Sequence, residues 1–248
     1  MVILSMLLMM MVVVLDQTSN AWNNAERKSG ALREARSALL IMARDFRAMA
    51  HNNSGSTILF NPSANEVEIA EPVAPMTTND RIFFLSLQSD SAQTTADASD
   101  LCMVGYYLAY TVDGNAPGSG SSYKLYRHYQ TSSHTVPHMV TLAHTPAGQS
   151  WATASYTTDE MLAKNIIDLQ VDLFRRNETG RLELLEAGMD WPTDETPALV
   201  QISFKALGEH GARALSSQTD WHNDSPLLHV ITQNSQPFTT RIRPGGGG

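Results

Sequence analysis

Histidines gather in one part of the sequence and could in principle bind a metal ion. His134 and His138 are four residues apart, the spacing that places two imidazoles on one face of a helix and suits zinc. Pro137 lies between them and disfavours that helix, because proline removes a backbone donor and clashes with the preceding turn. With His128 and His144 the group could form a cluster on a loop, but a solvated loop explains the same residues. We therefore expect no metal ion here.

Two tryptophans beside polar residues could line a sugar-binding surface. Asp190 precedes Trp191, and Trp221 begins the run WHND at 221–224. An aromatic ring beside hydrogen-bonding side chains is suited to such a ligand. A loop tryptophan of a β-rich fold is more often a packing residue, and we expect that role for both.

Motifs for other chemistry are lacking. The sequence has no phosphate-binding loop, no dinucleotide fingerprint and no G-x-S-x-G elbow. Residues 113–115 do not continue into the ligand series of a calcium loop. Cys102 is the only cysteine, which excludes an internal disulfide, and we expect it to be a small core residue. The net charge of -8 and a pI near 5.4 argue against a nucleic-acid surface. We expect a non-enzymatic protein without catalytic residues or cofactors.

The first fifteen residues are almost entirely apolar. Ser5 is the only polar residue before Asp16. The stretch could be a signal peptide, a membrane span, or a hydrophobic element of an ordinary soluble domain. A signal peptide has a basic region and a small-residue cleavage site, yet no Lys or Arg precedes Arg27. A membrane span needs about 20 apolar residues. We therefore expect the rear part of a membrane-inserted helix whose front lies upstream.

Further along, apolar residues recur every three or four positions, as on one face of a helix. No proline and a single glycine, Gly30, occur between Asp16 and Ala50, and HNNSGS at 51–56 is typical of a helix end. We expect one helix over residues 1–50, apolar in 1–15 and amphipathic in 16–50. The face expected to pack on a sheet consists of Leu32, Leu39, Met42, Phe46 and Met49. The residues between them, expected to face water or a partner, are Arg33, Glu34, Arg36, Arg44, Asp45 and Arg47.

The remaining sequence, 51–243, has the short alternating runs of β-strands. Expected strands, in hairpins or alone, are 56–60 with 66–70, 81–88, 101–112 with 123–130, 167–177 with 181–187, 199–207 and 237–244. Thr157 and Glu160 have capping-box spacing and predict a short helix over 157–166. We expect a surface loop or irregular insertion over 208–236 and a disordered tail over 244–248. A long N-terminal helix packed on antiparallel sheets is an α+β fold.

Four stretches resemble the pseudopilins, which are type IV pilin-like proteins. They are ARSALLIMARDFRAM at the helix end, VGYYLAYTVDG with YKLYRHY, NIIDLQVDLFRRNETG with DWPTDETPALVQISF, and QPFTTRIRP. The order is most similar to the J-type minor pseudopilin of type II secretion. Pseudopilin-like cassette proteins of Verrucomicrobia-type bacteria are similar at the same positions. The family's basic leader, its glycine and phenylalanine at the cleavage site, and its early glutamate have no counterpart before Asp16.

The resemblance implies a pilin-like fold and a minor pseudopilin at the tip of a pseudopilus, helping to prime assembly and protein export. It implies a single-pass protein of the bacterial inner membrane with its β-rich domain in the periplasm. Its partners would be other minor and major pseudopilins and an exported cargo protein. The membrane and assembly residues would be Ile3, Leu4, Leu7, Leu8, Val12, Val13 and Leu15. Alternatives are a minor type IV pilin or adhesin, and a membrane-anchored β-sandwich carbohydrate-binding module or hydrolase.

Overall fold

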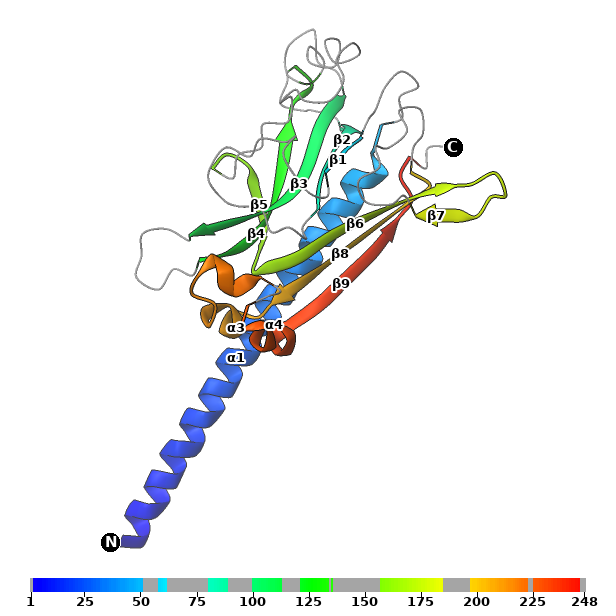
Figure 1. Cartoon of the computed structure of the whole chain (residues 1–248). Helices are drawn as coiled ribbons and strands as arrows, with labels where there is room; N and C mark the ends of the chain where they lie inside the picture. The colour runs from blue at the N-terminus through cyan, green and yellow to red at the C-terminus, as the bar shows by residue number, and fades with distance from the viewer. Residues whose placement is uncertain are drawn as a thin grey trace.

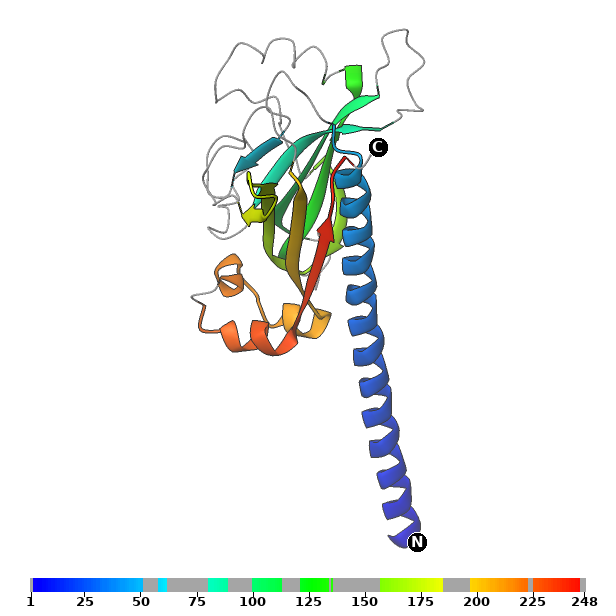
Figure 2. The same ribbon diagram turned by 90° about the vertical axis from the view of Figure 1, so that its right-hand side faces the viewer.

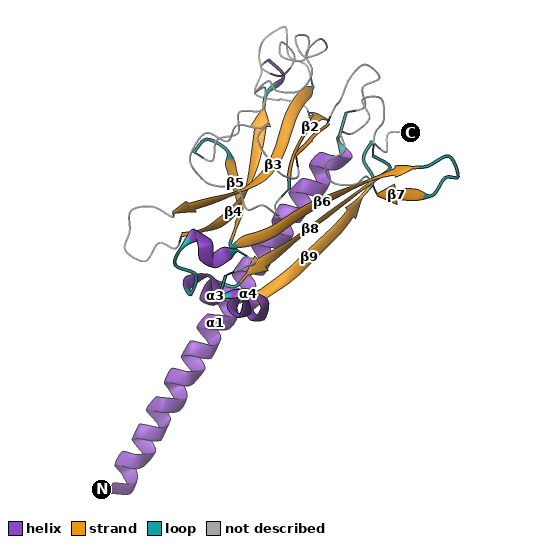
Figure 3. Ribbon diagram, viewed as in Figure 1, coloured by secondary structure: helices purple, strands orange, loops and turns teal. Residues whose placement is uncertain are grey.

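The computed structural model describes residues 2–50, 58–61, 80–88, 100–112, 121–133, 135, 157–184, 197–222 and 225–245. Within them the chain forms one long helix, two antiparallel sheets and several short helical segments, an α+β fold (Figures 1 and 3). The helices are α1 (Val2–Arg47), α3 (Glu209–Arg213), the 3-10 helix η1 (Gln218–Trp221) and α4 (Leu228–Asn234). The strands are β1 (Ile58–Asn61), β2 (Arg81–Leu87), β3 (Leu101–Val112), β4 (Ser121–Gln130), β5 (Glu160–Lys164), β6 (Ile166–Arg176), β7 (Leu182–Leu184), β8 (Leu199–Leu207) and β9 (Ser235–Ile242).

Helix α1 is the longest element and extends well beyond the rest of the molecule. Its C-terminal part lies along the sheets, and its N-terminal part projects away from them (Figures 1 and 2). Arg44 and Arg47 occupy the last turn, where cations interact favourably with the helix dipole. The helix ends at Arg47, a few residues before the predicted end at Ala50, because Met49 leaves it to form a β-bridge with Ser86 of β2.

The strands form two sheets with the orders β1-β2-β3-β4-β5 and β7-β6-β8-β9. The predicted hairpins β3–β4 and β6–β7 are confirmed, as are strands β2, β8 and β9. Strand β1 pairs with β2, while its predicted partner at 66–70 lies outside the described residues.

Asn165 and Asp80 join the two sheets. Asn165 lies between β5 and β6 with φ 57°, a left-handed conformation that asparagine tolerates. The Asp80 N–H donates to the Leu169 carbonyl at 2.9 Å, and the Val171 N–H donates to Asp80 Oδ2 at 2.7 Å. Both bonds use backbone groups of β6 near the register shift between Ile167 and Gln170. The irregular part of β6 therefore holds the start of β2.

One hydrophobic core lies between α1 and the two sheets. The helix contributes Phe46, which stacks on Phe84 of β2 with ring centroids 4.3 Å apart. Val171 and Phe204 are buried core residues of β6 and β8. Gly105 of β3 provides space for Phe83, because a Cβ at this glycine would lie 2.1 Å from the phenylalanine ring.

The predicted helix over 157–166 is wrong, because residues 160–164 form strand β5. It pairs with β4, with Leu125 opposite Ala163 and Lys124 opposite Lys164. Ala163 is buried in the core. The capping-box spacing of Thr157 and Glu160 was a local signal, and pairing at the open edge of β4 outweighed it.

The predicted loop at 208–236 is also wrong in its described part, which contains α3, η1 and α4. Ser217 and Asp220 form a reciprocal capping box at η1. Trp221 and Ile231 contribute buried side chains to the core. In the tail, the Gly245 N–H donates to the Arg47 carbonyl at 3.3 Å, and 246–248 lie outside the described residues.

Candidate functional site

The N-terminal part of α1 exposes a concentration of large apolar side chains. Residues 9–15 are exposed throughout, and each is Met, Val or Leu. Trp22, two turns further along, is 73% exposed. A monomeric protein rarely leaves a contiguous apolar surface in water, and such a surface marks a site of contact with a protein or a membrane. This part of α1 is the candidate functional site.

The structure locates the predicted membrane and assembly residues within α1. Val12, Val13 and Leu15 are exposed there. Ile3, Leu4, Leu7 and Leu8 belong to the same helix, but their side chains lie outside the described set. Among the described residues, no helix contains a stretch both long enough and apolar enough to span a bilayer.

The opposite end of α1 is fixed to the sheets by an apolar face. Met42 and Phe46 of the helix are buried, as is Met49 two residues beyond its end, and Leu32 and Leu39 are partly buried against the same core. These are the residues that the periodicity placed on the sheet side. Side chains at alternating spacings of three and four share one face of a helix, so the packed stripe follows from sequence alone.

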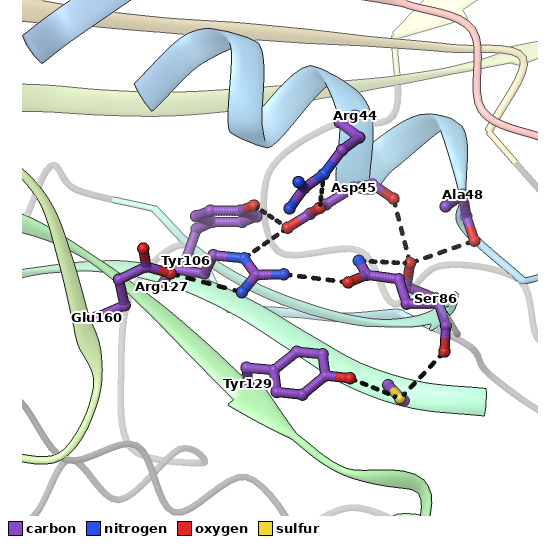
Figure 4. A network of polar contacts seen from close by, with 10 residues as sticks. Arg44, Asp45, Ala48, Ser86, Tyr106, Arg127, Tyr129 and Glu160 are labelled. Carbon is purple, nitrogen blue, oxygen red and sulfur yellow. Dashed lines mark hydrogen bonds and ion pairs between the residues drawn. The ribbon is translucent and has the colours of Figure 1, made fainter. Parts of the chain in front are cut away.

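Asp45 corrects the expectation that it faces water or a partner, because its side chain is completely buried. Tyr106 Oη and Arg127 Nε each donate a hydrogen bond to Asp45 Oδ2, both at 2.6 Å (Figure 4). Arg44 Nε donates to the other carboxylate oxygen at 3.1 Å. The carboxylate therefore links the C-terminal end of α1 to two adjacent strands of the five-stranded sheet, β3 and β4.

The contacts of Arg127 and Ser86 extend this network. Arg127 donates to Gln88 Oε1 at 3.2 Å and forms an ion pair with Glu160 at 3.6 Å. Gln88 Nε2 donates to Ser86 Oγ at 3.1 Å, and this hydroxyl lies 3.3 Å from the Ala48 carbonyl (Figure 4). The polar groups at the C-terminal end of α1 are thus satisfied by strand residues, as buried polar groups must be.

The electrostatics of the network hold Arg127 in its charged form and Tyr106 in its neutral form. Burial alone would lower the pKa of Arg127, but the hydrogen bond and the negative charge of Asp45 outweigh it and raise that pKa. Burial, together with the charge and hydrogen bond of Asp45, raises the pKa of Tyr106 well above its usual value. Tyr106 therefore stays a neutral donor, and Arg127 carries the positive charge.

Of the four histidines weighed as metal ligands, His128 alone lies within the described residues. Its Nδ1 lies 2.8 Å from Asp159 Oδ1, and Tyr107 Oη donates to Asp159 Oδ2 at 2.7 Å. His134, His138 and His144 lie outside the described residues. No group of three or more His, Cys, Asp or Glu side chains that could hold a metal ion occurs among those described.

Trp221 is a packing residue, so the alternative in which its ring binds a sugar is wrong. The indole is completely buried and meets Tyr123 edge to face, with centroids 6.2 Å apart. Asp190 and Trp191 lie outside the described residues. Cys102 is buried, as expected, with its sulfur 3.1 Å from Tyr129 Oη.

Comparison with known proteins gave one similar structure. No protein-family model matches the chain, and no curated protein matches it. The similar structure is a chain in the crystal structure of the GspK–GspI–GspJ complex from the enterotoxigenic Escherichia coli type 2 secretion system. The two chains are 11% identical, the match covers 86% of this chain and 97% of the other, and the TM-score is 0.40. At these values the likeness establishes neither family nor function.

Proposed function

We propose that this chain is a minor pseudopilin, a non-enzymatic structural subunit of a membrane-rooted pseudopilus of the type II secretion kind. The observation that carries the proposal is the projecting part of α1, whose apolar side chains are exposed over residues 9–15. The four stretches that resemble pseudopilins support it independently of the geometry. In this proposal α1 packs against the helices of other subunits, and the sheets form a periplasmic head.

The exposed apolar side chains provide the driving force for insertion and assembly. Burying a side chain of the size of Val, Leu or Met is worth roughly 1.5–3 kcal/mol, so seven in a row strongly disfavour an exposed helix. Met9, Met10 and Met11 are unbranched and polarisable, which suits irregular gaps between neighbouring helices. Once in the bilayer, helices associate through close packing of their side chains.

The anchored end of α1 gives the head a fixed relation to the projecting part. The helix is continuous from Val2 to Arg47, and the Asp45 network holds its end on β3 and β4. The contacts that a subunit makes through α1 therefore determine where its head lies. A head placed in this way at a filament tip could prime assembly and contact an exported cargo, as the proposed role requires.

The test is a charge placed in the apolar segment. Val12→Asp and Val13→Asp should each abolish membrane retention of the full chain in a bacterial host, because a charge opposes insertion of the apolar segment, by as much as about 2.5–3.5 kcal/mol at the centre of an inserted helix. Ser19→Asp, an exposed polar position on the same helix, is the matched control. Fractionation and incorporation into a pseudopilus would be measured together. Retention of the Val12 and Val13 variants in the membrane would contradict the proposal.

A further inference from the structure

The outer face of α1 carries a line of exposed arginines, of which only Arg44 takes part in the Asp45 network. Arg33, Arg36, Arg44 and Arg47 are exposed, and Leu40 in the middle of the line is 72% exposed. At 100° per residue these five positions fall within an arc of about 80° and extend over about 21 Å of helix. We call them the basic stripe. In Figure 2 the side of α1 away from the sheets lies on the outside of the molecule.

The basic stripe is unusual in its setting. The chain has 25 acidic and 17 basic residues, yet four of the basic ones share this narrow face, and Glu34 lies about 80° outside it around the helix. Among the described residues, Arg44 contacts Asp45, whereas no ion pair involves Arg33, Arg36 or Arg47. Beyond the contact of Arg44 with Asp45 and the place of Arg44 and Arg47 in the last turn, these like charges have no countercharge on the helix face that they share. Their Coulomb energy is available to a partner of opposite charge.

We infer that the basic stripe is a docking face for an acidic α-helix of a different subunit. The inference rests on the proposed function, because it assumes that subunits meet side by side along α1. A helix with Asp or Glu at three- and four-residue spacing presents carboxylates along a line of similar pitch. Arginine pairs with carboxylates through two parallel hydrogen bonds, which fixes orientation as well as affinity. Leu40 supplies an apolar contact at the centre, where water is excluded first.

Two other occupants fit the stripe less well. A symmetric contact between two copies would place the arginines of one against those of the other. Lipid headgroups are too far away, because Arg33 is 18 residues beyond Leu15, or about 27 Å along the helix. That separation is about three times the Debye length at physiological salt, roughly 8 Å.

The test is crosslinking from inside the stripe in the full-length protein. A photoreactive amino acid replaces Leu40 in cells of the native host, and mass spectrometry identifies the residue to which it attaches. Leu184, an exposed leucine of β7, is the matched position away from the stripe. We expect position 40 to attach to a helical segment of another subunit with acidic residues three or four apart. We expect position 184 not to reach that segment.

Charge reversal then tests the electrostatic cause. Arg36→Glu/Arg47→Glu should lower the position-40 product at least about tenfold, because like charges across a contact cost several kcal/mol. Arg36→Lys/Arg47→Lys should retain most of it. Arg176→Glu/Arg181→Glu makes the same change in net charge on the exposed β6–β7 hairpin and should have no effect. Raising the salt concentration should lower the yield of the position-40 product when all four arginines are present, because salt screens the charges. This measurement does not depend on the folding of any arginine variant.

Each other outcome overturns the inference. The first is attachment of position 40 to a second copy of this chain, to lipid, or to a segment without acidic residues. The second is the absence of any crosslinked product. The third is a product whose yield changes neither with charge reversal at Arg36 and Arg47 nor with salt. The proposed function fails separately. If the product forms with an acidic helix of a protein that is no membrane-rooted subunit, the docking face stands and the pseudopilin proposal falls. If Val12→Asp stays in the membrane, only the proposed function is contradicted.

Discussion

Replacing Arg127 with methionine should destabilise the protein strongly, because it removes the buried countercharge of Asp45 and leaves only the more exposed Arg44. Asp45 is inaccessible to water and accepts its shortest hydrogen bonds from Arg127 Nε and Tyr106 Oη. Removing one partner of a buried pair costs about 3–5 kcal/mol, against a total stability of about 5–15 kcal/mol for a typical domain. Urea denaturation at pH 7 should show this loss as a lower midpoint with an unchanged slope.

Replacing Asp45 alone, and then together with its partners, shows whether the loss of stability comes from breaking the Asp45–Arg127 pair. Asp45→Leu alone should cost about as much, since Arg127 then keeps only Glu160, at 3.6 Å and more exposed, as a countercharge. The combination Asp45→Leu, Arg127→Met and Tyr106→Phe removes both charges and the orphaned hydroxyl, and should lie within about 2 kcal/mol of the parent. Strong non-additivity is therefore expected.

Arg44→Met is the matched control. Its side chain also contacts Asp45 but is 67% exposed, so its loss should cost less than about 1 kcal/mol. If Arg127→Met cost no more than Arg44→Met, or if the single effects simply added, Asp45 and Arg127 would not act as the pair described above.

The remaining predictions concern packing and pH. Phe46→Ala should lower the free energy of unfolding by about 3–5 kcal/mol, and an unchanged melting curve would remove this ring from the core. Gly105→Ala should lower the free energy of unfolding by about 1–3 kcal/mol, because its Cβ would lie 2.1 Å from the Phe83 ring. An unchanged melting temperature would show that the ring can move away without cost. Burial raises the pKa of Asp80 from its ordinary 3.8 to about 6, against the opposing effect of the Val171 N–H. The native state therefore binds the Asp80 proton more tightly than the unfolded state does. The stabilising contribution of Asp80 to the free energy of unfolding is fully present below pH about 4 and falls by about 1–2 kcal/mol as the pH rises through 6, after a reduction for partial exposure. Asp80→Asn keeps an acceptor for Val171 and should flatten that part of the stability profile, whereas an identical profile would exclude Asp80 as its source.

Elements with a clear period were predictable from sequence. The stripe from Leu32 to Met49 and the strands with alternating residues follow directly from side-chain geometry. The strand in the segment 157–166 was not predictable in this way, because it forms only by pairing with β4, which lies far away in the sequence. The burial of Trp221 was anticipated as packing, but the short helices around it were hidden by a polar composition.

Asp45 was missed for a different reason. A charged residue in an amphipathic helix is ordinarily solvated, and its neighbours Arg44 and Arg47 are exposed. One signal was available: Asp45 falls about 60° from Met42 on the helical wheel, on the edge of the apolar stripe. Its partners, Tyr106 and Arg127, are 61 and 82 residues away, so no local pattern could have named them.

The uninterrupted course of α1 makes it a lever. Its 46 residues correspond to a rod of about 69 Å, with no proline to bend it. A rotation of about 10° at the sheets would move the far tip by about 11 Å, which is about the width of a helix with its side chains. Apolar packing tolerates small rotations, whereas the directional bonds of Asp45 do not. The hydrogen bonds of Asp45, at the pivot of this lever, therefore restrict the position of the N-terminal end of α1 some 65 Å away.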